Sequence, residues 1–160
     1  ELVDLLKASA PARIVSVASI AHRRAVIDFD DLQLTNGFGS WKAYSRSKLA
    51  NIMFTYALAR RLEGTGVTAN CLHPGFVRSH FGKNNRFLAR VGISLAMRFG
   101  NAISVAQGAQ TSVHLASAAE VADQTGLYFD ECKAVKSNQA SYDRDAQEKL
   151  WDISATMVGL

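Results

Sequence analysis

Tyr44 and Lys48 are the two residues in this sequence whose types and spacing best suggest chemistry. They lie four positions apart in Ala-Tyr-Ser-Arg-Ser-Lys (43–48), near the start of a strongly helical stretch. Residues four apart share one face of an α-helix, so the phenol and the ammonium lie close together. A free tyrosine, with a pKa of about 10, is a poor base at neutral pH. An ammonium about 5 Å from a phenolate, at an effective dielectric of about 20, stabilises it by roughly 3 kcal/mol. The pair therefore predicts proton exchange with an alcohol or a carbonyl.

A serine upstream supplies a third group for the same chemistry. The apolar run Arg-Ile-Val-Ser-Val-Ala-Ser (13–19) ends at Ser19 and is typical of a strand buried on both sides within a parallel sheet. Ligands of open α/β folds bind at the carboxyl ends of such strands. We therefore expect the Ser19 hydroxyl to hydrogen-bond the substrate oxygen while Tyr44 exchanges the proton. Ser16, three residues earlier, faces the other side of a regular strand and is the alternative.

The elements that must position these residues alternate between strands and helices. This order predicts an α/β fold, the C-terminal portion of a Rossmann-type doubly wound parallel sheet, with about three parallel strands and flanking helices. Residues 20–40 form a polar connection. The expected elements are the end of a helix at 1–8, strands at 13–19, 67–72 and 126–129, and helices at 41–62, about 104–119 and 143–157.

The helix from Trp41 to Leu62 is apolar on two faces. One stripe contains Leu49, Ile52, Met53 and Tyr56, and the other contains Ala50, Phe54, Leu58 and Leu62. A helix with two apolar faces packs on two sides. We expect the sheet to cover one face and a partner helix of a second subunit to cover the other, which would make the protein a homodimer.

Composition narrows the class of protein. The 160 residues carry a net charge of +4, and their lysines and arginines are dispersed without a nucleic-acid-binding motif, so nucleic acid is not expected as a partner. Cys71 and Cys132 lack metal-ligand spacing, so we expect no metal site and a reducing intracellular compartment, cytoplasmic or membrane-associated. No apolar run is long enough to span a membrane.

The motifs together resemble those of the short-chain dehydrogenases/reductases. Ser19, Tyr44-Ser-Arg-Ser-Lys48 and His73-Pro-Gly75 look like the family's serine, YxxxK and Pro-Gly motifs, in the same order and at similar separations. YxxxK alone is weak evidence, but the serine strand before it and the Pro-Gly pair after a strand make the match specific. Further runs resemble the retinol dehydrogenase-like branch, namely 13–22, 47–51 and 64–68.

The resemblance implies a role for each matching residue. Tyr44 would be the acid/base, Ser19 would orient the oxygen, and Lys48 would assist Tyr44 and hold the nicotinamide ribose. The residues that would contact the cofactor are Tyr44, Lys48, Pro74, Gly75, Val77 and Ser79. The resemblance favours NADP(H) and leaves NAD(H) open. The family's glycine-rich loop has no match here, so we interpret residues 1–160 as an incomplete domain that holds the catalytic and substrate-binding half.

Three functions follow from these patterns. The leading hypothesis is an NAD(P)-dependent oxidoreductase that interconverts an alcohol and an aldehyde or ketone, acting on a lipophilic, retinoid-like substrate. A second is a catalytically incomplete fragment that serves only as an interaction or dimerisation module. A third is a related NAD-dependent epimerase or dehydratase, against which the Pro-Gly segment argues.

Two further features can be interpreted either as structural or as functional. Residues 86–99 contain an apolar stripe with basic flanks, typical either of a core-packed helix or of an apolar lid that would suit peripheral membrane contact. His73 precedes Pro74 at the end of a strand, and we expect it to be a polar residue of the sheet edge rather than a base.

Overall fold

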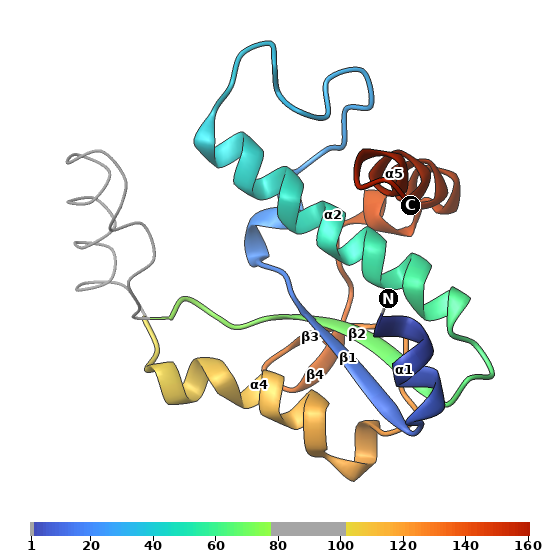
Figure 1. Ribbon diagram of the computed structural model, residues 1–160. Coiled ribbons are helices and arrows are strands. Elements are labelled where there is room, and N and C mark those ends of the chain that lie inside the picture. The colour runs from blue at the N-terminus through green and yellow to red at the C-terminus, as the bar shows by residue number, and fades with distance from the viewer. Residues whose placement is uncertain (1, 78–101) are drawn as a thin grey trace.

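A four-stranded sheet in the order β1-β2-β3-β4 forms the centre of the computed structural model, which describes residues 2–77 and 102–160 (Figure 1). The strands are β1 (Ala12–Val17), β2 (Val67–His73), β3 (Tyr128–Asp130) and β4 (Lys133–Val135). β1 pairs in parallel with β2, and β2 pairs in parallel with β3. The parallel pairs require crossover connections, which contain α2 and α4. The predicted α/β class and parallel sheet are confirmed.

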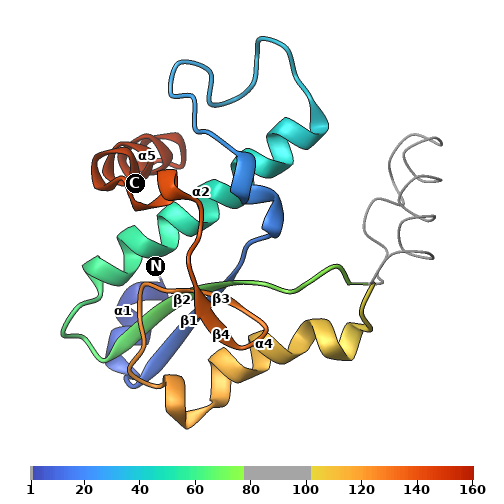
Figure 2. The same cartoon turned by 180° about the vertical axis from the view of Figure 1, so that it is seen from behind.

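Helices cover both faces of this sheet. α2 and α5 lie over one face and α4 over the other, as the two opposite views show (Figures 1 and 2). The helices are α1 (Leu2–Ala8), α2 (Ser40–Arg61), α4 (Val105–Ser117) and α5 (Arg144–Met157), and the shorter 3₁₀ segments are η1 (Ile20–Arg24), η2 (Ala119–Val121) and η3 (Gln139–Tyr142). Within the described ranges, no helix combines the length and apolar character needed to cross a bilayer.

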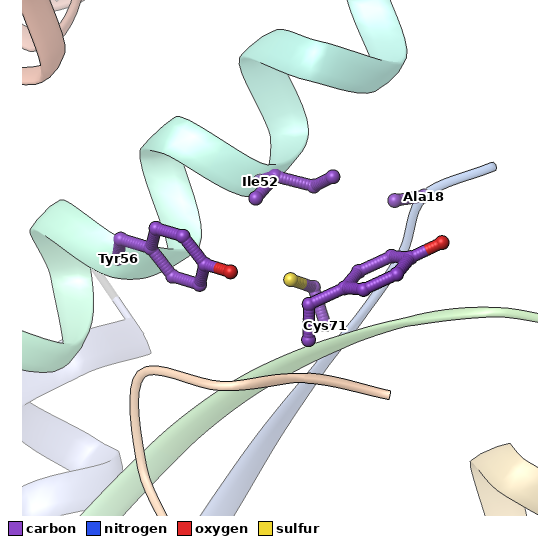
Figure 3. Packing of buried hydrophobic residues seen from close by; sticks show 5 residues of the cluster. Ala18, Ile52, Tyr56 and Cys71 are labelled. Carbon is purple, nitrogen blue, oxygen red and sulfur yellow. The ribbon is translucent and has the colours of Figure 1, made fainter. Parts of the chain in front are cut away.

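Neighbouring residues of β2 and β3 enter opposite cores. Cys71 and Tyr128 pack with Ile52 and Tyr56 under α2, whereas Leu72 and Phe129 pack with residues of the α4 side. Figure 3 shows Ile52 and Tyr56 reaching from α2 toward Cys71 and Ala18. Successive side chains of a strand point to opposite faces, so β2 and β3 contribute side chains to both cores. The expectation that the run 13–19 is buried on both sides is not met, because the residues of β1 are only partly buried and Val17 is exposed.

The expectation of three strands was incomplete because a short antiparallel strand closes one edge of the sheet. β3 and β4 pair with Asp130 opposite Lys133, which leaves only Glu131 and Cys132 in the turn. Both have positive φ, 47° and 62°. Two-residue hairpin turns of this kind favour Asn-Gly or Asp-Gly, so Glu-Cys gave no recognisable hairpin signal.

The second apolar face of α2 is covered in part by the same chain. The Phe54 and Trp151 rings stack 5.1 Å apart, and the Arg61 guanidinium lies 4.0 Å from the centroid of the Trp151 ring. α5 therefore covers part of the α2 surface that we expected a partner subunit to cover. A homodimer through the Trp41–Leu62 helix stays a prediction, limited to the surface that α5 leaves open.

Candidate active site

Tyr44 and Lys48 project from the first turns of α2 on the same side of the helix. The Lys48 Nζ lies 5.7 Å from the centroid of the Tyr44 ring, and both side chains are partly exposed. Lys48 also donates a hydrogen bond of 3.2 Å to the carbonyl oxygen of Val17, the last residue of β1. This bond ties the helix to the carboxyl end of the strand that leads to Ser19.

Ser19 lies two residues beyond the end of β1 rather than at the end of the strand. It is the N-cap of η1, where its Oγ accepts a hydrogen bond of 3.3 Å from the Ala21 backbone N–H. The predicted strand 13–19 was therefore two residues too long at this end, because the capping serine starts a 3₁₀ turn. Ser16 lies inside β1, paired with Cys71. The structure places Ser19, and not Ser16, in the loop beyond the carboxyl edge.

The segment from Pro74 to Val77 follows β2 at the same edge of the sheet. Gly75 has a φ of +83°, and a Cβ built there would lie 2.6 Å from Ile103 Cδ1. The Ile103 N–H donates to the Phe76 carbonyl at 2.9 Å, and Val77 forms an isolated bridge with Ile103. The backbone of this segment is thus fixed by neighbours on the chain. Ser79, and the segment 86–99 interpreted above as a lid or a core helix, lie outside the described residues.

Asn138 supports the Ser19 loop from the other end of the chain. Its Nδ2 group donates to the carbonyl oxygens of His22, Arg23 and Ala25 at 2.9, 3.2 and 2.9 Å. Sequence reasoning missed this residue, because nothing in the local pattern around Asn138 indicates a contact over more than a hundred positions.

His22 holds Ser19 more directly. The ring is fully buried, and its Nδ1 lies 2.6 Å from the Ser19 carbonyl oxygen, so Nδ1 carries the proton of this bond. Burial lowers the pKa of His22 from its ordinary value, and the nearby Arg23 charge acts in the same direction. A neutral His22 therefore fixes the backbone of the capping serine.

Two exposed aromatic side chains precede Tyr44. Trp41 lies one helical turn earlier, with its ring centroid 5.8 Å from that of Tyr44, and 68% of it is exposed. Phe38, in the loop before α2, is 72% exposed. Large exposed aromatic groups beside a polar site are typical of surfaces that bind apolar ligands.

These contacts bring three segments to the carboxyl ends of two neighbouring strands. Lys48 links the first turns of α2 to the end of β1, Ser19 follows β1, and the Pro74–Val77 segment follows β2, which pairs with β1 in parallel. Crevices at this edge of open α/β sheets bind nucleotide ligands.

The chain belongs to the short-chain dehydrogenase family. The family model described as short chain dehydrogenase matches residues 1–87, a range that includes Ser19, Tyr44, Lys48 and the Pro74–Val77 segment. The resemblance drawn from the three motifs is confirmed.

Individual relatives agree with this assignment. Human retinol dehydrogenase 14 is 46% identical over 166 residues, which cover 99% of this chain and 48% of that protein. Mouse retinol dehydrogenase 12 is 42% identical over 159 residues, which cover 99% of this chain and 49% of that protein. The solved structure of an uncharacterised protein from Mycobacterium paratuberculosis matches with a TM-score of 0.66 and 26% identity, over 91% of this chain and 49% of that one. The chain spans about half the length of the curated relatives it matches.

Proposed function

We propose that this chain carries the catalytic part of an NAD(P)-dependent oxidoreductase that interconverts an alcohol and a carbonyl compound. The observation that carries the proposal is the contact geometry of Lys48, whose Nζ lies 5.7 Å from the Tyr44 ring centroid and 3.2 Å from the carbonyl oxygen at the end of β1. Membership of the short-chain dehydrogenase family supports it.

The residues at the carboxyl edge fit the nicotinamide end of such a cofactor. When bound, the nicotinamide supplies or accepts the hydride. Gly75 has a φ of +83°, and Ile103 fills the space that a Cβ would take there, so a larger residue at 75 would displace the backbone that we propose presents its peptide groups to the nicotinamide. Pro74, Gly75 and Val77 would contact the carboxamide, Lys48 and Tyr44 the ribose side, and Ser79 the cofactor beyond them. NADP(H) is the favoured form and NAD(H) the alternative.

Tyr44 and Ser19 have separate roles at the substrate oxygen. In the reductive direction, the Ser19 Oγ hydrogen-bonds the carbonyl oxygen, and the Tyr44 hydroxyl donates its proton to that oxygen while the carbonyl carbon gains the hydride. Lys48 stabilises the phenolate that Tyr44 becomes, and the phenolate regains a proton from solvent. The oxidative direction reverses these transfers. Positioned acid–base groups typically contribute 10²–10⁴-fold to rate.

The substrate we infer is lipophilic and retinoid-like. The curated relatives named above are retinol dehydrogenases, and the exposed Trp41 ring offers apolar area next to the proposed proton donor. A substrate of this kind partitions into lipid, so peripheral membrane contact stays a prediction.

Replacement of Tyr44 by phenylalanine tests the proposed chemistry. NADPH binding is first measured by fluorescence titration, for this chain and for the chain joined to the matching half of retinol dehydrogenase 14. Reduction of retinal is then compared between wild type and Tyr44→Phe, and we expect kcat to fall by about 10²–10⁴-fold with NADPH affinity nearly unchanged. Tyr142→Phe is the matched control, because the Tyr142 hydroxyl accepts a hydrogen bond from Ser137 in the η3 region and should not affect turnover.

Two results would oppose the proposal. Full activity of Tyr44→Phe would remove the acid/base assignment. Failure of both proteins to bind NADPH would instead favour the interaction module.

Trp41→Ala tests the substrate class separately. We expect the KM for retinal to rise while the KM for a short aliphatic aldehyde is unchanged, because only the long apolar chain can reach the indole. An equal change in both KM values would mean that Trp41 supports the helix rather than the substrate.

A further inference from the structure

His73, the last residue of β2, joins the two loops that form the candidate site. Its Nδ1 accepts hydrogen bonds from the Ile20 N–H at 3.4 Å and from the Gly75 N–H at 3.3 Å. Ile20 directly follows Ser19, and Gly75 lies in the Pro74–Val77 segment. One ring nitrogen therefore contacts the serine loop and the Pro-Gly loop at once.

This arrangement defines the protonation state of the ring. An imidazole nitrogen that accepts hydrogen bonds carries no proton, so the proton of neutral His73 lies on Nε2. Protonation of Nδ1 would turn the acceptor into a donor and break both contacts. The two loops can thus be held in this way only while His73 is neutral.

The surroundings of His73 favour the neutral form. Burial lowers the pKa of His73 from its ordinary value of 6.5, and the Arg23 guanidinium of η1 lowers it further. The Asp130 carboxylate, across from His73 in the β2–β3 register, opposes this shift. His22, also in η1, is likewise held neutral by burial. At neutral pH the acceptor is therefore available.

We propose that His73 is a positioning residue that sets the separation between the Ser19 loop and the Pro74–Gly75 backbone. In the proposed reaction these two loops hold the substrate oxygen and the nicotinamide, so His73 fixes the distance between hydride donor and acceptor. This role in catalysis rests on the proposed function, whereas the contacts of Nδ1 do not. A misplacement of about 1 Å between reacting groups can cost up to about 10²-fold in rate.

Two substitutions separate this role from simple packing. In His73→Asn the side-chain oxygen lies close to the position of Nδ1, and an asparagine readily accepts from the N–H two residues later. In His73→Gln the amide lies one bond further out, near Nε2, and misses both donors. We expect retinal reduction by His73→Asn to stay within about twofold of wild type, and that of His73→Gln to fall about tenfold or more, with similar melting temperatures.

The pH profile provides a second readout. Wild-type kcat should fall at acid pH as His73 gains a proton below its ordinary pKa, and His73→Asn should lack this acid limb. A packing role alone predicts no such difference. Equal activity of the two variants, or an acid limb that persists in His73→Asn, would overturn the proposal.

Nuclear magnetic resonance tests the contacts without any need for catalysis. In the wild-type chain the ¹⁵N signal of Nδ1 should be that of an unprotonated nitrogen at pH 7, and the amide signals of Ile20 and Gly75 should shift together as His73 titrates. A protonated Nδ1 at pH 7, or amide signals that ignore the titration, would refute the contacts. If these signals behave as expected and Tyr44→Phe proves fully active, the proposed function fails while the contacts of His73 stand.

Discussion

Gly108 allows α4 to approach the Pro74–Val77 segment, and its replacement by alanine gives a sharp test of this packing. Gly108 is buried in the first turns of α4. A Cβ built there would lie 2.3 Å from Val77 Cγ2, 3.2 Å from Val77 Cγ1 and 3.3 Å from the Pro74 carbonyl oxygen. Carbon atoms in good contact are about 3.5–4.0 Å apart, so the new methyl group requires a movement of more than about 1 Å.

Movement of the atoms around this methyl group costs free energy. Valine is stiff about χ1, and the Pro74 oxygen belongs to the backbone. Overpacking of this kind costs about 1–3 kcal/mol, whereas alanine in place of glycine favours a helix interior by about 1 kcal/mol. We therefore expect Gly108→Ala to lower the free energy of unfolding by about 0–2 kcal/mol.

A double-mutant cycle isolates the clash from the change in helix propensity. Val77→Ala removes both γ-carbons, which are the two nearest contacts of the new methyl group apart from the Pro74 oxygen. In that background Gly108→Ala should stabilise the chain by up to about 1 kcal/mol, because the propensity gain is left nearly alone. Denaturant unfolding of the wild type, the two single variants and the double variant should give a coupling energy of about 1–3 kcal/mol.

The sign of the stability change in each background tests the predicted clash between residues 108 and 77. If Gly108→Ala changes stability equally in both backgrounds, the two residues do not meet as the structure shows. A stabilising effect in the wild-type background would lead to the same conclusion. Either result would also contradict the close packing of α4 against Val77 and the Pro74 carbonyl oxygen.

Three further predictions use other parts of the chain. Burial raises the pKa of the Cys71 thiol to about 12, so an alkylating reagent at pH 8.5 should modify Cys132 in the folded chain and Cys71 only after unfolding, as mass spectrometry can show. Hydrogen bonds from Arg61, chiefly, lower the pKa of Glu148 to about 2 from an ordinary 4.5, so its stabilisation is full above pH 4.5 and is lost as pH falls toward 2. Denaturant midpoints of wild type and Glu148→Gln should converge over that range, with a gap that narrows in high salt; a gap independent of pH would contradict the ion pair. Asn138→Asp keeps the oxygen that caps η3 but loses the donors to η1, so it should lower stability by about 1–3 kcal/mol, and an unchanged melting temperature would show that these bonds are dispensable.

The helix that carries Tyr44 and Lys48 was predictable because its signals are local. The apolar periodicity of 41–62 predicted a helix that the structure places at Ser40–Arg61, and the spacing of Tyr44 and Lys48 placed both side chains on one side. The strand pattern of 67–72 likewise matches β2 apart from its last residue. In these segments each residue's preference agrees with the final fold, which is why a single sequence is sufficient.

The supports of the site were not predictable because they depend on contacts between distant segments. His73 looked like a polar edge residue, and its acceptor role appears only when Ile20, 53 positions earlier, is brought beside it. Asn138 contacts η1 over a separation of 113 to 116 positions. The β3–β4 turn has two residues of positive φ without glycine, a choice that tertiary packing permits and local propensity does not favour.

The divided surface of α2 shows how one helix serves both packing and chemistry. Its buried stripe of Leu49, Ile52 and Met53 fixes the rotation of the helix about its own axis, since all three are almost completely buried. That rotation leaves Tyr44 and Lys48 partly exposed, and the hydrogen bond from Lys48 to Val17 links this end of the helix to the end of β1. A substitution that loosened the packing of this stripe would therefore move the Tyr44 phenol without contacting it. The precision of the proposed acid/base thus depends on core packing as well as on the residues of the site.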